Sequence, residues 1–207
     1  MNQGSTAACL VVIALAGCAA GSSPKTNFYV LNVEGKPARG EAVAGTPVNV
    51  SIARAAIPGV VDRPQIVART AANGLEILDF HRWAEPLQEA IPRVVAGDLA
   101  LALGPRYVVA AGAVPGVPPD IRVSLNVQRF EAVMGAGVTV EVLWSVRPAV
   151  GEVRAGRSLF EERATESGPA GIAAAYSRAL VGVAQDIAAA IATASVTAFT
   201  RSQPSRP

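Results

Sequence analysis

The sequence is poor in the residue types on which most catalytic and metal sites depend. It contains a single histidine, His81, and two cysteines, Cys9 and Cys18. A cluster of histidine ligands is therefore impossible, and a serine–histidine–aspartate triad would have to be built on His81 alone. The chain also lacks a Gly-x-Ser-x-Gly motif for a nucleophile and a Gly-Lys-Ser/Thr motif for phosphate binding. We predict that the protein is not an enzyme and that its folded part holds no metal and no cofactor.

Charge is also scarce. Only 16% of the residues are charged, with 18 Lys and Arg against 16 Asp and Glu, which gives a net charge of +2. The basic residues form no block or stripe that could neutralise a row of phosphates, so we expect no nucleic-acid partner. Because 51% of the residues are hydrophobic, we expect a chain that folds rather than one that stays disordered.

The first 24 residues carry no charged side chain, and residues 7–16 form an apolar run too short to span a bilayer. The string Leu-Ala-Gly-Cys at 15–18 follows this run and resembles the bacterial lipobox. We predict a signal peptide over 1–17, cleavage between Gly17 and Cys18, and a diacylglycerol on the Cys18 thiol. Because Cys9 lies in the leader, the folded part would have no free thiol.

Residues 18–27 comprise the lipidated cysteine and a short Gly, Ser and Pro segment that predicts a flexible tether. The residue after the cysteine is Ala19 rather than Asp, which resembles the lipoproteins sorted to the outer membrane. We therefore expect a lipid-anchored protein of the cell outer membrane that faces the periplasm.

Alternating apolar and polar residues predict β-strands in several parts of the chain. The expected strands cover 28–33, 48–53, 65–70, 75–80, 121–127, 138–146 and 156–163. The pair Asn73-Gly74 predicts a hairpin turn with positive φ, and a second turn is expected at 135–137. Trp144 falls on the inward face of its strand. Glu161 and Glu162 are adjacent in a strand and point to opposite faces, so they are expected to be solvated charges rather than a catalytic pair.

Two segments have the apolar spacing of helices. The first follows Trp83 and ends before Gly104, with Pro86 suited to a first turn and Pro92 predicting a kink. The second begins near Gly168. Its core-facing stripe consists of Ile172, Tyr176, Leu180, Val183, Ile187 and Ile191. We predict one globular domain over 28–200 and a disordered tail over 201–207.

Two strings, DRPQIV at 62–67 and RWAEPL at 82–87, resemble the PqiC-type auxiliary lipoproteins of ABC and MCE (mammalian cell entry) transport systems. The resemblance extends from 28–31 to the helix at 176–180. It implies an outer-membrane partner of a periplasmic MCE-type subunit, whose conduit moves lipids or other hydrophobic molecules between membranes. It also implies an α/β (α+β) fold, a mixed and largely antiparallel sheet with two main helices, similar to the amino-terminal domain of TolB.

The residues of these strings have two interpretations. Pro64 disfavours a helical Arg63, and Asp62 can hydrogen-bond a following amide, so these residues could simply begin a strand. Trp83 suits a core anchor, and His81 suits a packing or capping role. The alternative is partner binding by Asp62, Arg63, Arg82 and Trp83, because arginine and tryptophan are common in interface hot spots.

Three functions are consistent with these residues. The transport accessory is favoured by the resemblance, and a structural envelope lipoprotein without a transporter is the alternative. An enzyme acting on lipid or cell wall is disfavoured by the missing catalytic motifs. A homo-oligomer is a further expectation, because the Ala-rich sides of the last helix could pack against a second copy.

Overall fold

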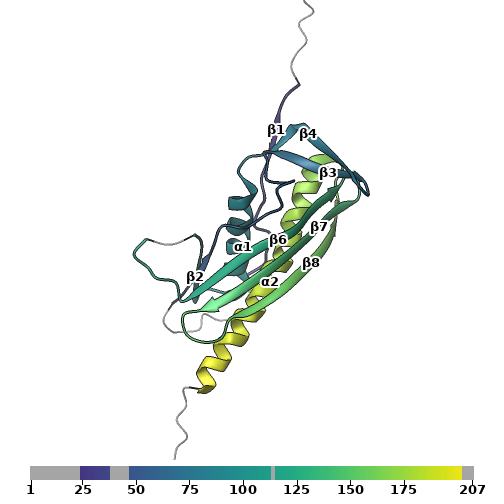
Figure 1. The fold of residues 1–207 in the computed structure, drawn as a ribbon. Helices are drawn as coiled ribbons and strands as arrows, with labels where there is room; N and C mark the ends of the chain where they lie inside the picture. Colours follow the sequence, from purple (N-terminus) through teal and green to yellow (C-terminus); the bar gives the residue numbers. More distant parts are fainter. Residues whose placement is uncertain (1–23, 38–46, 113–114, 202–207) are drawn as a thin grey trace, which may run out of the picture.

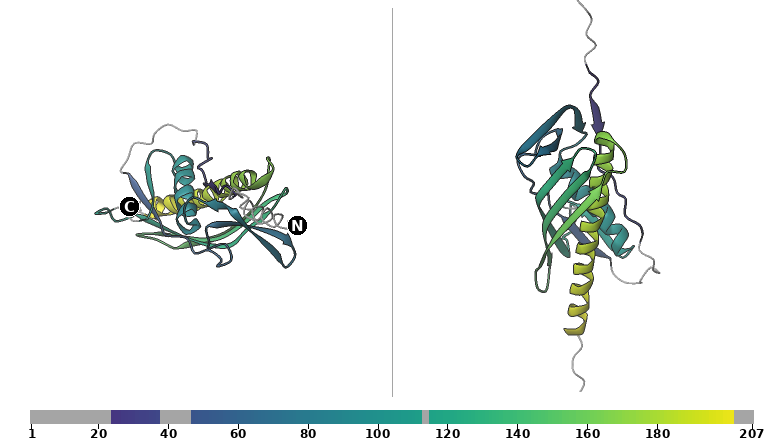
Figure 2. Two further views of the ribbon diagram at one scale, coloured as in Figure 1. Left: turned by 90° about the horizontal axis from the view of Figure 1, so that it is seen from above. Right: turned by 90° about the vertical axis from the view of Figure 1, so that its right-hand side faces the viewer.

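The computed structural model describes residues 24–37, 47–112 and 115–201, with side chains as far as Thr193. Within these residues eight strands form one sheet, and two helices cover one of its faces (Figures 1 and 2). The elements are β1 (Asn27–Tyr29), β2 (Val48–Ile52), β3 (Gln65–Ala71), β4 (Gly74–Trp83), α1 (Leu87–Leu103), β5 (Tyr107–Ala111), β6 (Ile121–Val133), β7 (Gly137–Pro148), β8 (Arg154–Arg163) and α2 (Gly168–Arg201).

The long strand β6 organises the sheet. On one side it pairs with β7, which in turn pairs with β8. On the other side, the first residues of β6 pair with β2, which pairs with β5. The last residues of β6 pair with β3, which pairs with β4, and β4 pairs with β1. The long ladders β3–β4, β6–β7 and β7–β8 are antiparallel, whereas the short ladders are parallel. This arrangement confirms the mixed, largely antiparallel sheet expected from the sequence.

The strict alternation in β6 determines which of its sides faces the helices. Ile121, Val123, Leu125 and Val127 are buried, while the residues between them are exposed. In β7 the buried residues are Val138, Val140, Val142 and Val146. These side chains meet α2, whose predicted apolar stripe is completely buried. The β6–β7 hairpin, the strand expected at 156–163 (β8) and the C-terminal helix are therefore confirmed, although Trp144 is half-buried rather than fully inward.

Helix α1 accommodates a proline in its interior. Pro92 has no N–H, so the carbonyl oxygen of Gln88 receives no hydrogen bond from it within the helix. The backbone N–H of Ala55 donates to this oxygen at 3.1 Å. The freed acceptor is thus used to fix the segment after β2 against α1. Pro86 lies just before the first turn, as the N-cap residue.

Two sequence predictions about turns and ends need correction. The β3–β4 hairpin exists, but Ala71 pairs with Gly74, so its turn residues are Ala72 and Asn73. Neither they nor Gly74 has positive φ, because an irregularity in the ladder beside Ala71 supplies the bend instead. The first strand is shorter than 28–33. Helix α2 includes Arg201, and the rest of the expected tail lies outside the described residues.

After β1 the chain runs along the helices as a strap, residues 31–35, that belongs to no strand. Side chains of the helices hold its backbone: Arg93 donates to the Leu31 carbonyl at 3.0 Å, and Ser177 Oγ accepts from the Asn32 N–H at 3.0 Å. Asp98 Oδ1 accepts from the N–H groups of Glu34 at 3.0 Å and Gly35 at 2.7 Å. Hydrogen bonds to side chains here replace those of a sheet.

Candidate functional site

The structure brings the two family-like strings together. The Trp83 N–H donates to the Pro64 carbonyl at 2.7 Å, so the segment before β3 lies beside the end of β4. Asp62 Oδ2 accepts a hydrogen bond from Gln88 Nε2 at 2.7 Å, where the sequence had suggested a following backbone amide. This contact joins the strand entry to α1. Arg63 is exposed.

Trp83 is a core residue. It is 6% exposed and packs edge-on against Phe130 and Tyr176, which stack on each other with centroids 3.7 Å apart. This burial favours the core interpretation of Trp83 over direct partner contact. Arg82 is half-buried and donates from Nε to the Asp79 carbonyl at 3.2 Å.

His81 has a local partner. Its Nδ1 lies 2.8 Å from the hydroxyl of Tyr29, and the two rings are 5.7 Å apart. The contact joins β1 to β4 beside the parallel pair Asn27 and His81. A packing role accounts for this histidine. Cys18 and Gly17 lie outside the described residues.

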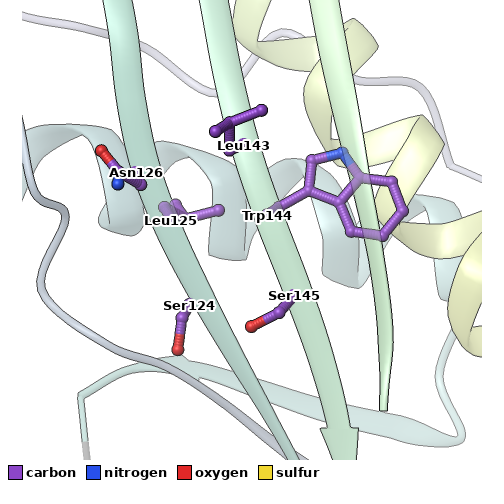
Figure 3. A pocket seen from close by; sticks show the side chains of 6 residues that line it. All are labelled: Ser124, Leu125, Asn126, Leu143, Trp144 and Ser145. Carbon is purple, nitrogen blue, oxygen red and sulfur yellow. The ribbon is translucent and has the colours of Figure 1, made fainter.

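A shallow hollow opens on the outer side of the β6–β7 hairpin, the side that the helices leave uncovered (Figure 3). Its volume is about 220 Å³. The lining residues are Ser124, Leu125, Asn126, Leu143, Trp144 and Ser145. Cross-strand pairing aligns Ser124 with Ser145 and Asn126 with Leu143, so hydroxyl and amide groups surround an apolar side chain. Such a surface can accept a partner segment through both hydrogen bonds and apolar contact.

Charges beside the hollow are unevenly neutralised. Arg122 and Arg147 are exposed and stand directly opposite each other in β6 and β7. Like charges at such a position repel, and among the described residues neither has a carboxylate within 4 Å. Arg157, in contrast, binds Glu141 at 2.7 Å, and this hydrogen bond lowers the pKa of the glutamate. The Arg122 end of the surface is therefore open to an acidic partner.

Beneath the hollow lies a series of three hydrogen-bonded side chains, which the sequence did not predict. Trp144 Nε1 donates to Ser158 Oγ at 2.9 Å, and this hydroxyl donates to Asp186 Oδ2 at 2.6 Å. These two hydrogen bonds link β7, β8 and α2. The indole covers Gly156, its cross-strand neighbour, where a β-carbon would overlap the ring.

Glu162 in β8 and Asp98 in α1 also make contacts within the fold. Glu162 lies 3.4 Å from Arg178 Nε, so it is not simply a solvated charge, whereas Glu161 is exposed. Asp98 is 2% exposed, and its Oδ2 has no partner among the described residues. Burial raises the pKa of Asp98, against the opposing effect of the hydrogen bonds from Gly35 and Glu34. Helical periodicity gave no signal for Asp98, because its partners lie in the distant strap.

Two further kinds of site or segment are absent from the described part of the chain. No group of three or more histidine, cysteine, aspartate and glutamate residues is arranged to hold a metal ion there. Neither is any helix there long and apolar enough to cross a membrane.

Comparison with known proteins adds a family and a fold. The family model described as "ABC-type transport auxiliary lipoprotein component" matches residues 29–188. A crystal structure of an uncharacterized protein has a TM-score of 0.67 and 18% identity, and the match covers 81% of this chain and 99% of that one. Protein XCC0632 from Xanthomonas campestris, assigned to the family model DUF330, has a TM-score of 0.66 and 17% identity, with 84% and 99% covered. At these identities the two structures show the fold alone. No curated protein sequence matches the chain.

Proposed function

This chain belongs to the family of ABC-type transport auxiliary lipoprotein components, and from that premise we propose that it is an outer-membrane accessory subunit of an MCE-type lipid transport system. In this role it holds the periplasmic MCE subunit at the membrane and so supports membrane integrity. The family match from β1 into α2 is the observation that carries the proposal. The family is one of transport accessories rather than of enzymes.

The amino-terminal sequence supplies the means of attachment. The lipobox-like string ends at Cys18, nine residues before β1 begins at Asn27. An extended segment of this length reaches at most about 30 Å. A diacylglycerol on Cys18 would therefore keep the domain close to the membrane surface while leaving its sheet free to meet a periplasmic partner.

The outer side of β6 and β7 is the surface that best fits such a partner. It is broad, the helices do not cover it, and its hollow combines the exposed Leu143 with serine and asparagine side chains. Arg122 and Arg147 add positive charge that no carboxylate of the described residues neutralises. We assign this surface to the MCE subunit, with an acidic segment lying next to the two arginines.

Co-purification from membranes tests the assignment. The tagged full-length chain should recover the MCE subunit, and Leu143→Arg should lower the recovery about tenfold, which corresponds to about 1.4 kcal/mol of binding free energy. Val108→Arg is the matched control, because Val108 is similarly exposed but lies in β5. Unchanged recovery with Leu143→Arg contradicts the assigned surface. Failure of the wild-type chain to recover any transporter component favours the structural lipoprotein.

Self-association is a separate proposal. Strand β8 pairs with β7 on one side only, and its other edge is open within the described residues. A second copy could add a strand there, although the charged residues along β8 oppose such pairing. Light scattering of the purified full-length chain distinguishes a monomer from an oligomer.

A further inference from the structure

Large apolar side chains gather at one end of the molecule. We define the apolar end as Phe28 in β1, Leu75, Ile77 and Phe80 in β4, Val133 at the end of β6, and Met134 in the following turn. Their exposed fractions lie between 36% and 65%. The two phenylalanines are the exposed aromatic side chains in the described part of the chain. Exposed apolar patches of this kind mark sites for a protein partner or a membrane.

The strand register places several of these side chains on one surface. Leu75 pairs with Arg69 in β3, and Arg69 pairs with Val133 in β6, so the two apolar side chains flank the arginine on the same face. Ile77 is two residues from Leu75 and shares its face, whereas Glu76 between them points to the opposite face. At the other end of β4, Phe28 pairs with Arg82, two residues after Phe80.

The position of this surface in the fold suggests its occupant. β1, β3 and β4 lie together at one end of the molecule, and α2 runs from there to the opposite end (Figures 1 and 2). The first described residue, Pro24, comes three residues before β1, so the chain from Cys18 enters the fold at the apolar end. The tether spans at most about 30 Å, whereas the 34 residues of α2 extend about 50 Å. A lipid on Cys18 would hold the apolar end, and not the far end of α2, near the membrane.

We propose that the apolar end is a lipid-contacting surface, which inserts shallowly into the membrane that carries the Cys18 anchor. This inference rests on the proposed lipid anchor. The free energy of phenylalanine and aliphatic side chains falls when they move from water to the boundary between headgroups and acyl chains. The tether keeps these side chains at high local concentration near that boundary. Contact through two points, the lipid and the apolar end, orients the domain with the β6–β7 surface to the side of its long axis.

Site-specific fluorescence tests the contact. In the acylated full-length protein the only free thiol is one introduced by substitution, because Cys9 leaves with the signal peptide. Leu75→Cys and the control Val108→Cys, with exposed fractions of 49% and 50% at the replaced residues, are labelled with an environment-sensitive dye. The proteins are placed in vesicles of phosphatidylethanolamine and phosphatidylglycerol, and circular dichroism verifies that each variant is folded. We expect a blue shift and quenching by lipid-borne quenchers at position 75, and the emission seen in water at position 108.

Each other outcome overturns the proposal. Emission typical of water at position 75, in a protein whose mass shows an acylated Cys18, refutes the lipid contact and leaves the proposed function intact. A blue shift that grows with protein density and resists lipid-borne quenchers assigns the apolar end to a second copy instead. If the mass of the mature protein shows no acyl group, the protein has no lipid anchor, and the proposed function and this inference fail together.

Discussion

The contact between Trp144 and Gly156 predicts that a small substitution has a large effect. Replacing Gly156 by Ala adds a methyl group that would overlap the indole ring, with Cζ2 closest and Cη2 at 2.6 Å. Elsewhere in a strand the same change is favourable by about 0.5 to 1 kcal/mol, because alanine loses less backbone entropy than glycine on folding. Here the ring has to move, and Gly156→Ala should destabilise the protein.

The size of the effect follows from the interactions of the ring. Moving the indole breaks its hydrogen bond to Ser158 Oγ at 2.9 Å, a loss of about 1 kcal/mol. Crowding and lost packing of the half-buried ring cost about 1 to 3 kcal/mol more. After the intrinsic gain from alanine is subtracted, the free energy of unfolding should fall by about 2 kcal/mol. For a chain of this length that corresponds to a fall in Tm of about 4 to 8 °C.

Calorimetry and denaturant unfolding of four variants measure this effect: Gly156→Ala, Gly59→Ala, Trp144→Ala and the double variant Trp144→Ala with Gly156→Ala. Gly59→Ala is the matched control, since a β-carbon there meets no atom within 4 Å, and its stability should stay equal or rise by up to about 1 kcal/mol. In a Trp144→Ala background, Gly156→Ala should lose its cost, because the overlapping ring is gone. A Gly156→Ala protein as stable as the wild type, or the same cost in both backgrounds, would refute the reasoning.

Two further predictions concern the anchor and a buried carboxyl group. Cys18→Ala should leave the signal peptide uncleaved and the protein without acyl mass, as fractionation and mass spectrometry will show, and a wild-type protein that keeps residues 1–17 contradicts the lipoprotein assignment. Burial raises the pKa of Asp98 in the folded protein. The protonated carboxyl group therefore contributes its full stability below the pKa of the unfolded chain, and this contribution is lost as pH rises through the pKa of the folded protein. Asp98→Asn, which resembles the protonated form, should therefore gain stability relative to the wild type as pH rises above about 4, and a difference that does not change with pH in urea unfolding series refutes this reasoning.

The sequence by itself determined most of the local elements of the fold, although it did not predict strand β5. Alternation with a period of two identified β6 and β7, and the apolar stripe of α2 identified its buried face. These patterns arise because side chains alternate across a strand and recur about every 3.6 residues in a helix. The sequence of a single segment therefore shows which of its sides is buried. The lipobox-like string at Cys18 is also local, since it is read from adjacent residues.

Sequence reasoning was less successful where a residue had both a structural and a binding interpretation. Asp62, Arg63, Arg82 and Trp83 could be singled out, but their roles could not be separated. Only the packed core shows that Trp83 lies against Phe130. The cause is that burial of a tryptophan at a strand end depends on which distant elements cover it.

Tertiary structure alone decided the features on which the proposals depend. The parallel pairing of β6 with β2 and β3 joins segments far apart in the chain, and no local period encodes it. The same holds for the Trp144–Ser158–Asp186 chain and for the partners of Asp98. The apolar end exists because three separate strands place exposed apolar side chains at the end of the molecule where β1 lies. Local sequence determines which faces are apolar, whereas the long-range packing determines which of those faces remain uncovered.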